Sequence, residues 1–563
     1  MKKLTTCILL AVASTCISAQ LVYNWAFNVG PPTSGAEANC MAMDKSGFVF
    51  VSGKFQGTMD FDPGTGVANQ TSSGFTDIYL AKYDNAGNYI WVKSFGSNSG
   101  GDWPTDIAVD DSGNIYITGR YRAPIDCDPG PGVFTLPTVF GDDIFLSKYD
   151  STGSFIWAKS LAGNGDDRSC SITIDSVMNV YITGSFQSAC DFDPGPATVN
   201  LTANGASDLF FAKYDSSGNY VWAKGLGGAT FNDEGRGIIL NSNGDVSLTG
   251  YFSGTCDFNV GSGTYNLTAV GAYDAFFAKY DNDGNFIWAK RMNSTMTGNV
   301  VSYDIDTDSI GNIYLCGYFN SNSDFDPGVG TAYLSTAGNN DIFFAKYTAA
   351  GNYVWAKAIG GGGTDECFHI MLDRNAKILL SGFFPNIADF NPGPGTAYLS
   401  ANGNNDIFFA HYDNNGNYLW AYSVGGSGDD RSYGFCQDSS GSVFIAGYFD
   451  AVCDFDPGAA VANLTPIGVV DLYVAKYSNL ITTITSVEAN YTEPYLYPNP
   501  TNNKIIIRFK GMLEVYTMLG EKVTEIDINA DNVEVDISSI PAGIYLCRLI
   551  SDSKIHIQSI IIQ

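Results

Sequence analysis

Residues 106–161 read DIAVDDSGNIYITGRYRAPIDCDPGPGVFTLPTVFGDDIFLSKYDSTGSFIWAKSL, and this stretch decides the fold. It contains four short segments rich in β-branched and aromatic residues, DIAVD, NIYITGRY, DIFLSKYD and SFIWAKSL, each bounded by Gly, Asn, Asp or Ser. The turns DDSGN and DSTGS supply Asn or Gly, which adopt positive φ at little cost. The stretch therefore predicts a four-stranded antiparallel meander.

The same pattern recurs along the chain with a period of about 66 residues. Its clearest marker is an Asp-aromatic-Asp-Pro-Gly pentad or a close variant, which begins at Asp60, Asp126, Asp191, Asp257, Asp324, Asp389 and Asp454. A repeated Trp and a string similar to Ala-Lys-Tyr-Asp keep the same period. Four strands in each of seven repeats, without helical periodicity, predict an all-β fold, a seven-bladed β-propeller.

The two ends of the repeat array are each incomplete. The seventh copy stops after Ser478 without its Trp-containing fourth strand, whereas VYNWAFN (Val22 to Asn28) is a fourth strand with no blade before it. We expect this N-terminal strand to complete the seventh blade and close the ring, which removes an exposed sheet edge. The alternative is an open array of sheets, which would need atypical capping units.

The segments outside the repeats predict the domain organisation. Residues 1–19 carry Lys2 and Lys3, an apolar run and Ala19, which together indicate a secretory signal peptide. Residues 20–478 are predicted as the propeller, 479–496 as a linker, and 497–563 as a small C-terminal β-sandwich. No other segment is apolar enough to predict a transmembrane span.

The C-terminal segment resembles the sorting domain of the type IX secretion system of Bacteroidota. The resemblance rests on YPNPT (Tyr497 to Thr501), LEVYTMLGEKV (Leu513 to Val523) and VDISSIPAGIYLCRL (Val535 to Leu549). It implies that residues 497–563 engage the type IX secretion machinery. The protein would then pass through the periplasm and the outer membrane and become extracellular or attached to the cell surface.

The repeats resemble the SBBP-type β-propeller repeats of secreted bacterial proteins. GNNDIFFAKY (Gly338 to Tyr347) and LTGYF (Leu248 to Phe252) carry this resemblance. It implies the fold and does not fix a function.

The charge balance restricts the partners. Lys and Arg number 29 against 58 Asp and Glu, giving a net charge of −29, which argues against nucleic acid and anionic membranes. An extracellular protein or a glycan is the expected partner. The cysteines show no CxxC or metal-ligand spacing, and buried thiols are favoured over disulfides.

Long acidic loops should gather on one face of a propeller built in this way, and such loops often bind ligands. The links between blades read NGDDR, GTDE and SGDDR, which makes Asp167, Asp365 and Asp430 candidate ligand-binding residues. Trp103 is a further candidate because it is the one Trp outside the repeat register.

The pentads allow two interpretations. Carboxylates at positions i and i+2 before a Gly turn resemble the start of a calcium loop. Alternatively, Asp organises a turn in which Pro fixes φ. The turn is favoured because no third acid follows at a fixed offset, and no cofactor is expected. The calcium candidates are Asp60, Asp62, Asp191, Asp193, Asp324, Asp326, Asp454 and Asp456.

The sequence does not predict an enzyme. His369, His411 and His556 are the only histidines, and none lies in a motif for a nucleophile, a general base or a metal. The leading prediction is a secreted or cell-surface binding or scaffold protein of the adhesin or glycan-binding type. The alternative is a glycan-active hydrolase or lyase that uses acids on the central loop face.

Overall fold

The structure is a computed structural model that describes residues 21–229, 231–479, 496–497, 504–507, 510–517, 522–530, 533–541, 543–551 and 554–562. The chain divides into two compact units, Met1–Leu480 and Ile481–Gln563. The predicted signal peptide lies outside the described residues, as does almost all of the predicted linker. Among the described residues, no helix is long and apolar enough to cross a membrane.

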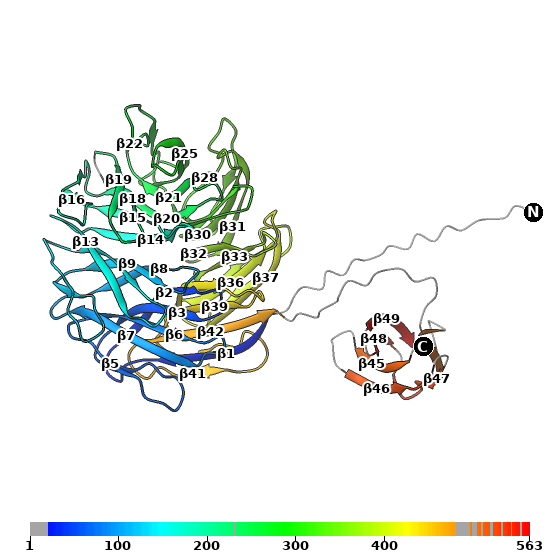
Figure 1. Ribbon diagram of the computed structural model, residues 1–563. Coiled ribbons are helices and arrows are strands. Elements are labelled where there is room, and N and C mark those ends of the chain that lie inside the picture. Colours follow the sequence, from blue (N-terminus) through cyan, green and yellow to red (C-terminus); the bar gives the residue numbers. More distant parts are fainter. Residues whose placement is uncertain are drawn as a thin grey trace, which may run out of the picture. The chain divides into compact units, whose positions relative to one another are not determined.

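Within the described part of the first unit, the long strands pair antiparallel in groups of four, and we call these groups blades and number them 1 to 7 in chain order. The all-β architecture predicted from the sequence is confirmed. The blades follow one another around a common axis, with the first strand of each blade nearest the axis (Figure 1). These first strands are β2 (Ala36–Met43), β8 (Trp103–Val109), β14 (Arg168–Ile174), β20 (Glu234–Leu240), β26 (Val300–Thr307), β32 (Glu366–Leu372) and β38 (Arg431–Gln437).

The second and third strands form the middle of each blade and are almost completely buried. The second strands are β3 (Val49–Phe55), β9 (Ile115–Tyr121), β15 (Val180–Phe186), β21 (Val246–Phe252), β27 (Ile313–Phe319), β33 (Ile378–Phe384) and β39 (Val443–Phe449). The third strands are β6 (Asp77–Tyr83), β12 (Asp143–Tyr149), β18 (Asp208–Tyr214), β24 (Asp274–Tyr280), β30 (Asp341–Tyr347), β36 (Asp406–Tyr412) and β42 (Asp471–Asn479).

The fourth strands lie on the outside of the blades. In blades 1 to 6 they are β7 (Tyr89–Ser97), β13 (Phe155–Gly163), β19 (Tyr220–Leu226), β25 (Phe286–Met292), β31 (Tyr353–Gly361) and β37 (Tyr418–Gly426). In blade 7 this place is taken by the N-terminal strand β1 (Leu21–Val29), which pairs antiparallel with β42 from Leu21 opposite Asn479 to Val29 opposite Leu472.

The pentad segments form small two-stranded hairpins rather than open loops. Four of these hairpins also pair with the fourth strand of the preceding blade, and Figure 1 places them at the outer rim. The hairpins are β4 (Thr58–Asp60) with β5 (Asn69–Thr71), β10 (Ile125–Asp126) with β11 (Thr135–Leu136), β16 (Ala189–Asp191) with β17 (Asn200–Thr202), β22 (Thr255–Asp257) with β23 (Asn266–Thr268), β28 (Ser323–Asp324) with β29 (Tyr333–Leu334), β34 (Ile387–Asp389) with β35 (Tyr398–Ser400), and β40 (Cys453–Asp454) with β41 (Asn463–Leu464).

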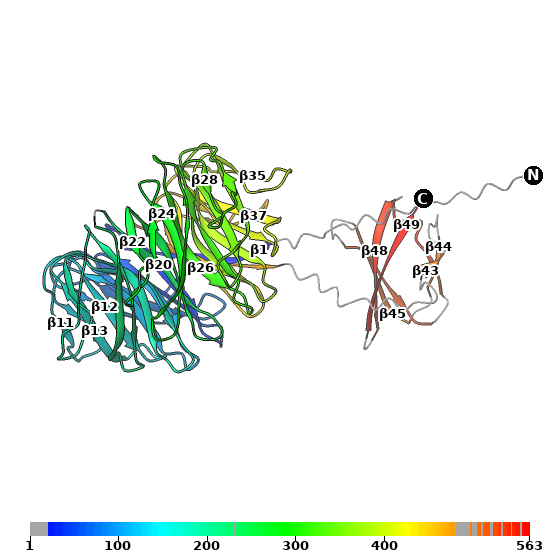
Figure 2. The same cartoon turned by 90° about the horizontal axis from the view of Figure 1, so that it is seen from above.

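The core of this unit lies between neighbouring blades, which pack face to face (Figure 2). Between blades 3 and 4, for example, Phe211 and Trp222 pack against Leu248 and Tyr280. The same junction has polar contacts, because Lys213 Nζ donates to Asn282 Oδ1 at 2.6 Å and Trp222 Nε1 donates to the Asn282 carbonyl at 3.2 Å. At this junction the repeated Lys and Trp therefore join the two blades.

The described part of the second unit contains two antiparallel sheets that share one hydrophobic cluster, including Leu496, Leu513 and Ile560. Of the three segments that carry the resemblance to the sorting domain, the described parts of Leu513 to Val523 and Val535 to Leu549 contain strands of this unit, and only Tyr497 of the first segment is described. One sheet contains β43 (Leu496–Tyr497), β44 (Lys504–Ile507) and β47 (Val533–Asp536), and the other contains β45 (Gly511–Thr517), β46 (Lys522–Ile528), β48 (Gly543–Ser551) and β49 (Lys554–Ile562).

Candidate functional site

Each first strand contains one irregularity of register at the same place, and one residue bulges there toward the axis. On β8, for example, the pairing with β9 shifts between Pro104 and Asp106, so Thr105 has no partner. Pro104 is buried whereas Thr105 is partly exposed, and the other blades alternate in the same way. Such bulges re-aim side chains and are common next to active sites. The seven bulge residues are Asn39, Thr105, Cys170, Arg236, Tyr303, Phe368 and Tyr433.

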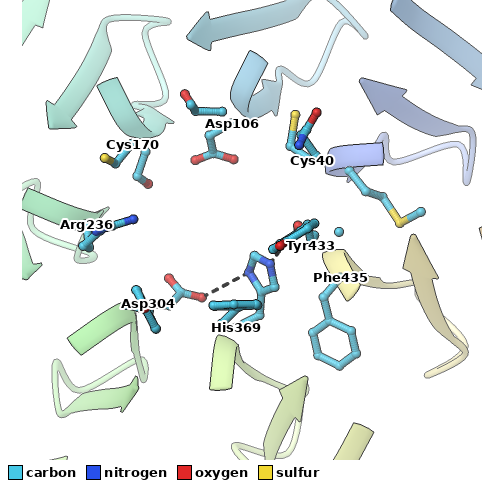
Figure 3. Close-up of a pocket in the computed structure, with 15 residues that line it drawn as sticks. Cys40, Asp106, Cys170, Arg236, Asp304, His369, Tyr433 and Phe435 are labelled. Carbon is cyan, nitrogen blue, oxygen red and sulfur yellow. Dashed lines mark hydrogen bonds and ion pairs between the residues drawn. The ribbon is translucent and has the colours of Figure 1, made fainter. Parts of the chain in front are cut away.

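The bulge residues, together with residues that directly follow them, line a cavity of about 350 Å³, which we call the central pocket. Small-molecule sites in proteins measure about 300–1,000 Å³. Figure 3 shows the side chains converging on this space from strands all around the axis. The seven bulge residues are of six types, and only Tyr occurs twice.

One side of the central pocket is aromatic. The ring centroids of Tyr303 and Phe368 lie 5.2 Å apart at an interplanar angle of 65°, and those of Phe368 and Tyr433 lie 5.2 Å apart at 31°. These separations fall in the range of favourable aromatic pairs. Three successive blades therefore form a continuous apolar wall, which we call the aromatic wall.

The other side is polar. Arg236 Nη2 lies 2.8 Å from Glu234 Oε2, and Arg168 Nε lies 3.1 Å from Glu234 Oε1. Burial alone raises the pKa of Glu234, but the two guanidinium groups outweigh it and the pKa is lowered. Two buried polar atoms on this side have no hydrogen-bond partner, the Nε of Arg236 and the Oδ1 of Asn39.

Two carboxylates and one imidazole complete the lining. Asp106 Oδ2 accepts the Ile172 N–H at 2.8 Å, and burial raises the pKa of Asp106 to about 6. His369 Nδ1 lies 3.7 Å from Asp304 Oδ2, the contact drawn in Figure 3, and its Nε2 lies 2.8 Å from the Tyr433 carbonyl. Burial alone lowers the pKa of His369, but its contacts with Asp304 raise it above the usual value.

Comparison with known proteins identifies both units. Residues 495–563 match the family described as a secretion system C-terminal sorting domain, and residues 90–120 match the SBBP beta-propeller repeat. The chain thus contains a segment that matches a β-propeller repeat and a segment that matches a C-terminal sorting domain. Both resemblances noted in the sequence are thereby confirmed, and the sorting domain implies a Bacteroidota source. It also indicates export by the type IX system to the cell surface or the medium.

The propeller also resembles longer proteins. An uncharacterized WD repeat-containing protein of Acanthamoeba polyphaga mimivirus is 25% identical over 74% of this chain and 35% of its own length. Regulatory protein FlaEY of Caulobacter vibrioides is 27% identical over 25% of this chain and 14% of its own length. The chain thus spans about a third of the first relative and less of the second.

Two solved structures match the chain at low similarity. Quinohemoprotein alcohol dehydrogenase ADHIIG of Pseudomonas putida is 11% identical, with a TM-score of 0.39 over 86% of this chain and 79% of its own. PorZ, a surface component of the type IX secretion system of Porphyromonas gingivalis, is 10% identical, with a TM-score of 0.18 over 95% of this chain and 100% of its own. At these scores neither likeness supports a statement about function.

The three acids proposed from the sequence as ligand-binding residues of the propeller are not on its surface. Asp167, Asp365 and Asp430 are 0% exposed. Each accepts a backbone N–H, for example that of Gln187 on Asp167 Oδ1 at 2.9 Å. The expectation that they form an exposed acidic face is therefore wrong, because the links between blades fold these side chains inward.

Trp103 lies two residues before Thr105 on β8 and is partly exposed. Its ring is covered by cations, with the Arg120 guanidinium 4.6 Å and the Lys54 ammonium 5.7 Å from the ring centroid. It does not line the central pocket. Trp103 is thus partly exposed, in contrast to the three buried acids.

The pentad carboxylates hold turns together. In the first copy, Asp60 Oδ1 accepts the N–H groups of Asp62 and Ala68 at 3.1 and 2.7 Å, and Asp62 Oδ1 accepts that of Gly64 at 2.8 Å. Asn259 Oδ1 accepts the Gly261 N–H in the same way at 3.0 Å. Among the described residues, no group of three or more His, Cys, Asp or Glu side chains could hold a metal ion. The ten described cysteines are free thiols.

Sequence reasoning missed the residues of the central pocket. The blades look uniform when they are aligned on Trp, Lys and the pentad, and the first strands carry none of these markers. The available signal was variability, since the bulge position changes from Asn to Arg to Tyr while the residue directly before it stays small.

Proposed function

We propose that this exported propeller is a binding protein of the adhesin or glycan-binding type and that its ligand occupies the central pocket. The observation that carries this proposal is the contrast between the uniform blades and the seven bulge residues, which differ in size, charge and aromaticity. A scaffold alone would not need such a contrast at one position. Binding sites are concave and combine apolar surface with a few convergent polar groups. The central pocket is concave, and it sets convergent polar side chains opposite one aromatic side.

We further propose that the ring has seven blades and is closed by the N-terminal strand. The support is the ladder between β1 and β42, together with the bridge from Gly35 to Val470 that links blades 1 and 7. Closure of this kind holds the pocket walls at a fixed spacing, because every blade then has two neighbours.

A glycan-active hydrolase or lyase is the second candidate. Asp106 and Asp304 both line the pocket, and paired carboxylates carry out glycoside hydrolysis. We favour binding because both oxygens of Asp106 accept backbone N–H groups, from Ile107 and Ile172, and are thereby fixed in structural contacts.

Retention and cleavage of polysaccharides separate these candidates. The secreted full-length protein is passed over immobilised polysaccharides, and the eluate is analysed for released oligosaccharides. We expect retention without release. The variant Thr105→Trp replaces an uncharged lining residue by a large side chain that fills the pocket. Retention should be lost in this variant. Retention that survives this substitution would place the ligand elsewhere, and release of oligosaccharides would establish the enzyme.

A further inference from the structure

The ligand class follows from the two walls of the central pocket, given the binding function proposed above. The aromatic wall presents three partly exposed rings, Tyr303, Phe368 and Tyr433, toward the cavity. Rings of this kind pack against C–H groups, which lie over the negative face of the π-system. A ligand with one apolar face of C–H bonds therefore fits this wall.

The opposite wall requires a ligand with hydroxyl groups. Arg236 and Asn39 both line the pocket on this side, and their side chains supply N–H donors and an amide oxygen acceptor. A ligand that makes hydrogen bonds with these groups is favoured over a purely apolar one. A hydroxyl group both donates and accepts, so it can pair with either side chain.

The charges of the pocket disfavour an acidic ligand. The cations each have a carboxylate partner, Arg236 and Arg168 at Glu234 and His369 at Asp304. Arg236 and Arg168 share the single carboxylate of Glu234, whereas Asp106 makes no ion pair in the described part of the chain, so these charges balance and leave no excess of cations to attract an anion. A ligand carboxylate in a cavity of about 350 Å³ would also lie close to Asp106 and Asp304.

We propose that the central pocket binds the terminal residue of a neutral saccharide, whose apolar ring face lies on the aromatic wall and whose hydroxyl groups bind Arg236 and Asn39. One or two sugar rings combine an apolar face of C–H bonds with hydroxyl groups, and these fit the aromatic wall and the polar side of the pocket. An aliphatic ligand would make no hydrogen bond with Arg236 or Asn39, and a peptide has no comparably rigid face of C–H bonds.

The test measures the binding of small saccharides to the secreted full-length protein by saturation-transfer NMR and titration calorimetry. The probes are the methyl glycosides of glucose, galactose, mannose and N-acetylglucosamine, with glucuronate and galacturonate as acidic counterparts. We expect at least one neutral glycoside to bind and the uronates to bind at least tenfold more weakly. Phe368→Leu and Asn39→Leu should each weaken binding by about tenfold, as expected for the loss of one wall contact.

Phe75→Leu is the matched control, because Phe75 is 69% exposed on a loop outside the pocket. Melting curves of all variants establish that they are folded. Uronates binding as well as neutral glycosides, or equal weakening by Phe75→Leu and Phe368→Leu, would overturn the saccharide proposal. If no glycoside binds but Thr105→Trp still abolishes polysaccharide retention, this proposal fails and the binding function stands. If Thr105→Trp leaves retention intact, both fail.

Discussion

Trp25 on the N-terminal strand lies directly opposite Lys476 on the last strand of the repeat array. Lys82 and Trp91 have the same relationship inside blade 1, as do Lys148 and Trp157 inside blade 2. Blade 7 is thus assembled from both ends of the array in the register that the chain uses elsewhere. Trp25 also contacts Gly87 of blade 1, since a Cβ added there would lie 3.1 Å from its ring.

This register predicts that Trp25→Ala destabilises the ring as much as Trp91→Ala, the same change within a continuous blade. Each variant should lose about 2–3 kcal/mol, because a large aromatic side chain is removed from a packed junction. Thermal unfolding of the two variants and the parent measures this. Deletion of Val22 to Asn28 should lower the melting temperature further. A Trp25 variant that melts like the parent, beside a weakened Trp91 variant, would show that the N-terminal strand is dispensable.

The strands could be predicted because their turns depend on contacts between residues that are close together in the sequence. Turn residues such as those at Asp110–Asn114 are stabilised within five residues, since Asp110 Oδ1 accepts the N–H groups of Ser112 and Asn114. Seven copies of such local information also fix the register. The hairpins at the pentads were harder to predict, because their pairing with the preceding blade is a contact between repeats.

The central pocket could not be predicted because it depends on contacts between residues far apart in the chain. Asn39 and Tyr433 line the same cavity only because the first strands surround one axis. The acids of the links were misjudged for a related reason. Asp167 reads as a surface residue in a polar loop, yet its carboxylate satisfies a backbone N–H under that loop.

The pentad turns predict indifference to calcium. Asn391 Oδ1 accepts the Gly393 N–H at 2.9 Å just as Asp193 Oδ1 accepts that of Gly195 at 2.8 Å, so the turn needs an acceptor and not a charge. Asp193→Asn should therefore leave the melting temperature unchanged, whereas Asp193→Ala should cost about 1 kcal/mol. Melting with and without EDTA should coincide. A drop on chelation that Asp193→Asn partly reproduces would reveal bound calcium instead.

The sorting domain predicts where truncated proteins accumulate. A chain that ends near Asn490 lacks residues 495–563 and should collect in the periplasm of a host with the type IX system. Residues 490–563 fused to a reporter should appear outside the cell. Immunoblots of periplasmic and culture fractions measure both. Normal secretion of the truncated chain would contradict the assigned route, and a reporter retained inside the cell would show that the domain is not sufficient.

The blade junctions contain paired buried carboxylates whose oxygens lack partners. Between blades 5 and 6, Asp341 and Asp365 are 3% and 0% exposed, and Oδ1 of each has no hydrogen-bond partner. Asp406 and Asp430 repeat the arrangement between blades 6 and 7. Burial raises the pKa of Asp365 and of Asp430 to about 7, with a further increase from the neighbouring acid.

These pairs predict a propeller that is more stable in mild acid than at alkaline pH. The folded pKa of about 7 for Asp365 and Asp430 exceeds the unfolded value of about 3.9, so the folded state binds more protons between them. The resulting stability is fully present below about pH 4 and is lost as the pH rises through about 7. Each pKa unit corresponds to about 1.4 kcal/mol.

We expect a higher melting temperature at about pH 5.5 than at about pH 8. The variant with Asp365→Asn and Asp430→Asn should reduce this difference and melt higher at about pH 8. The variant with Asp128→Asn and Asp193→Asn removes the same net charge from part-exposed pentads and should keep the parent's pH dependence. Equal effects of the two variants would mean that overall charge repulsion, and not the buried pairs, sets the pH response.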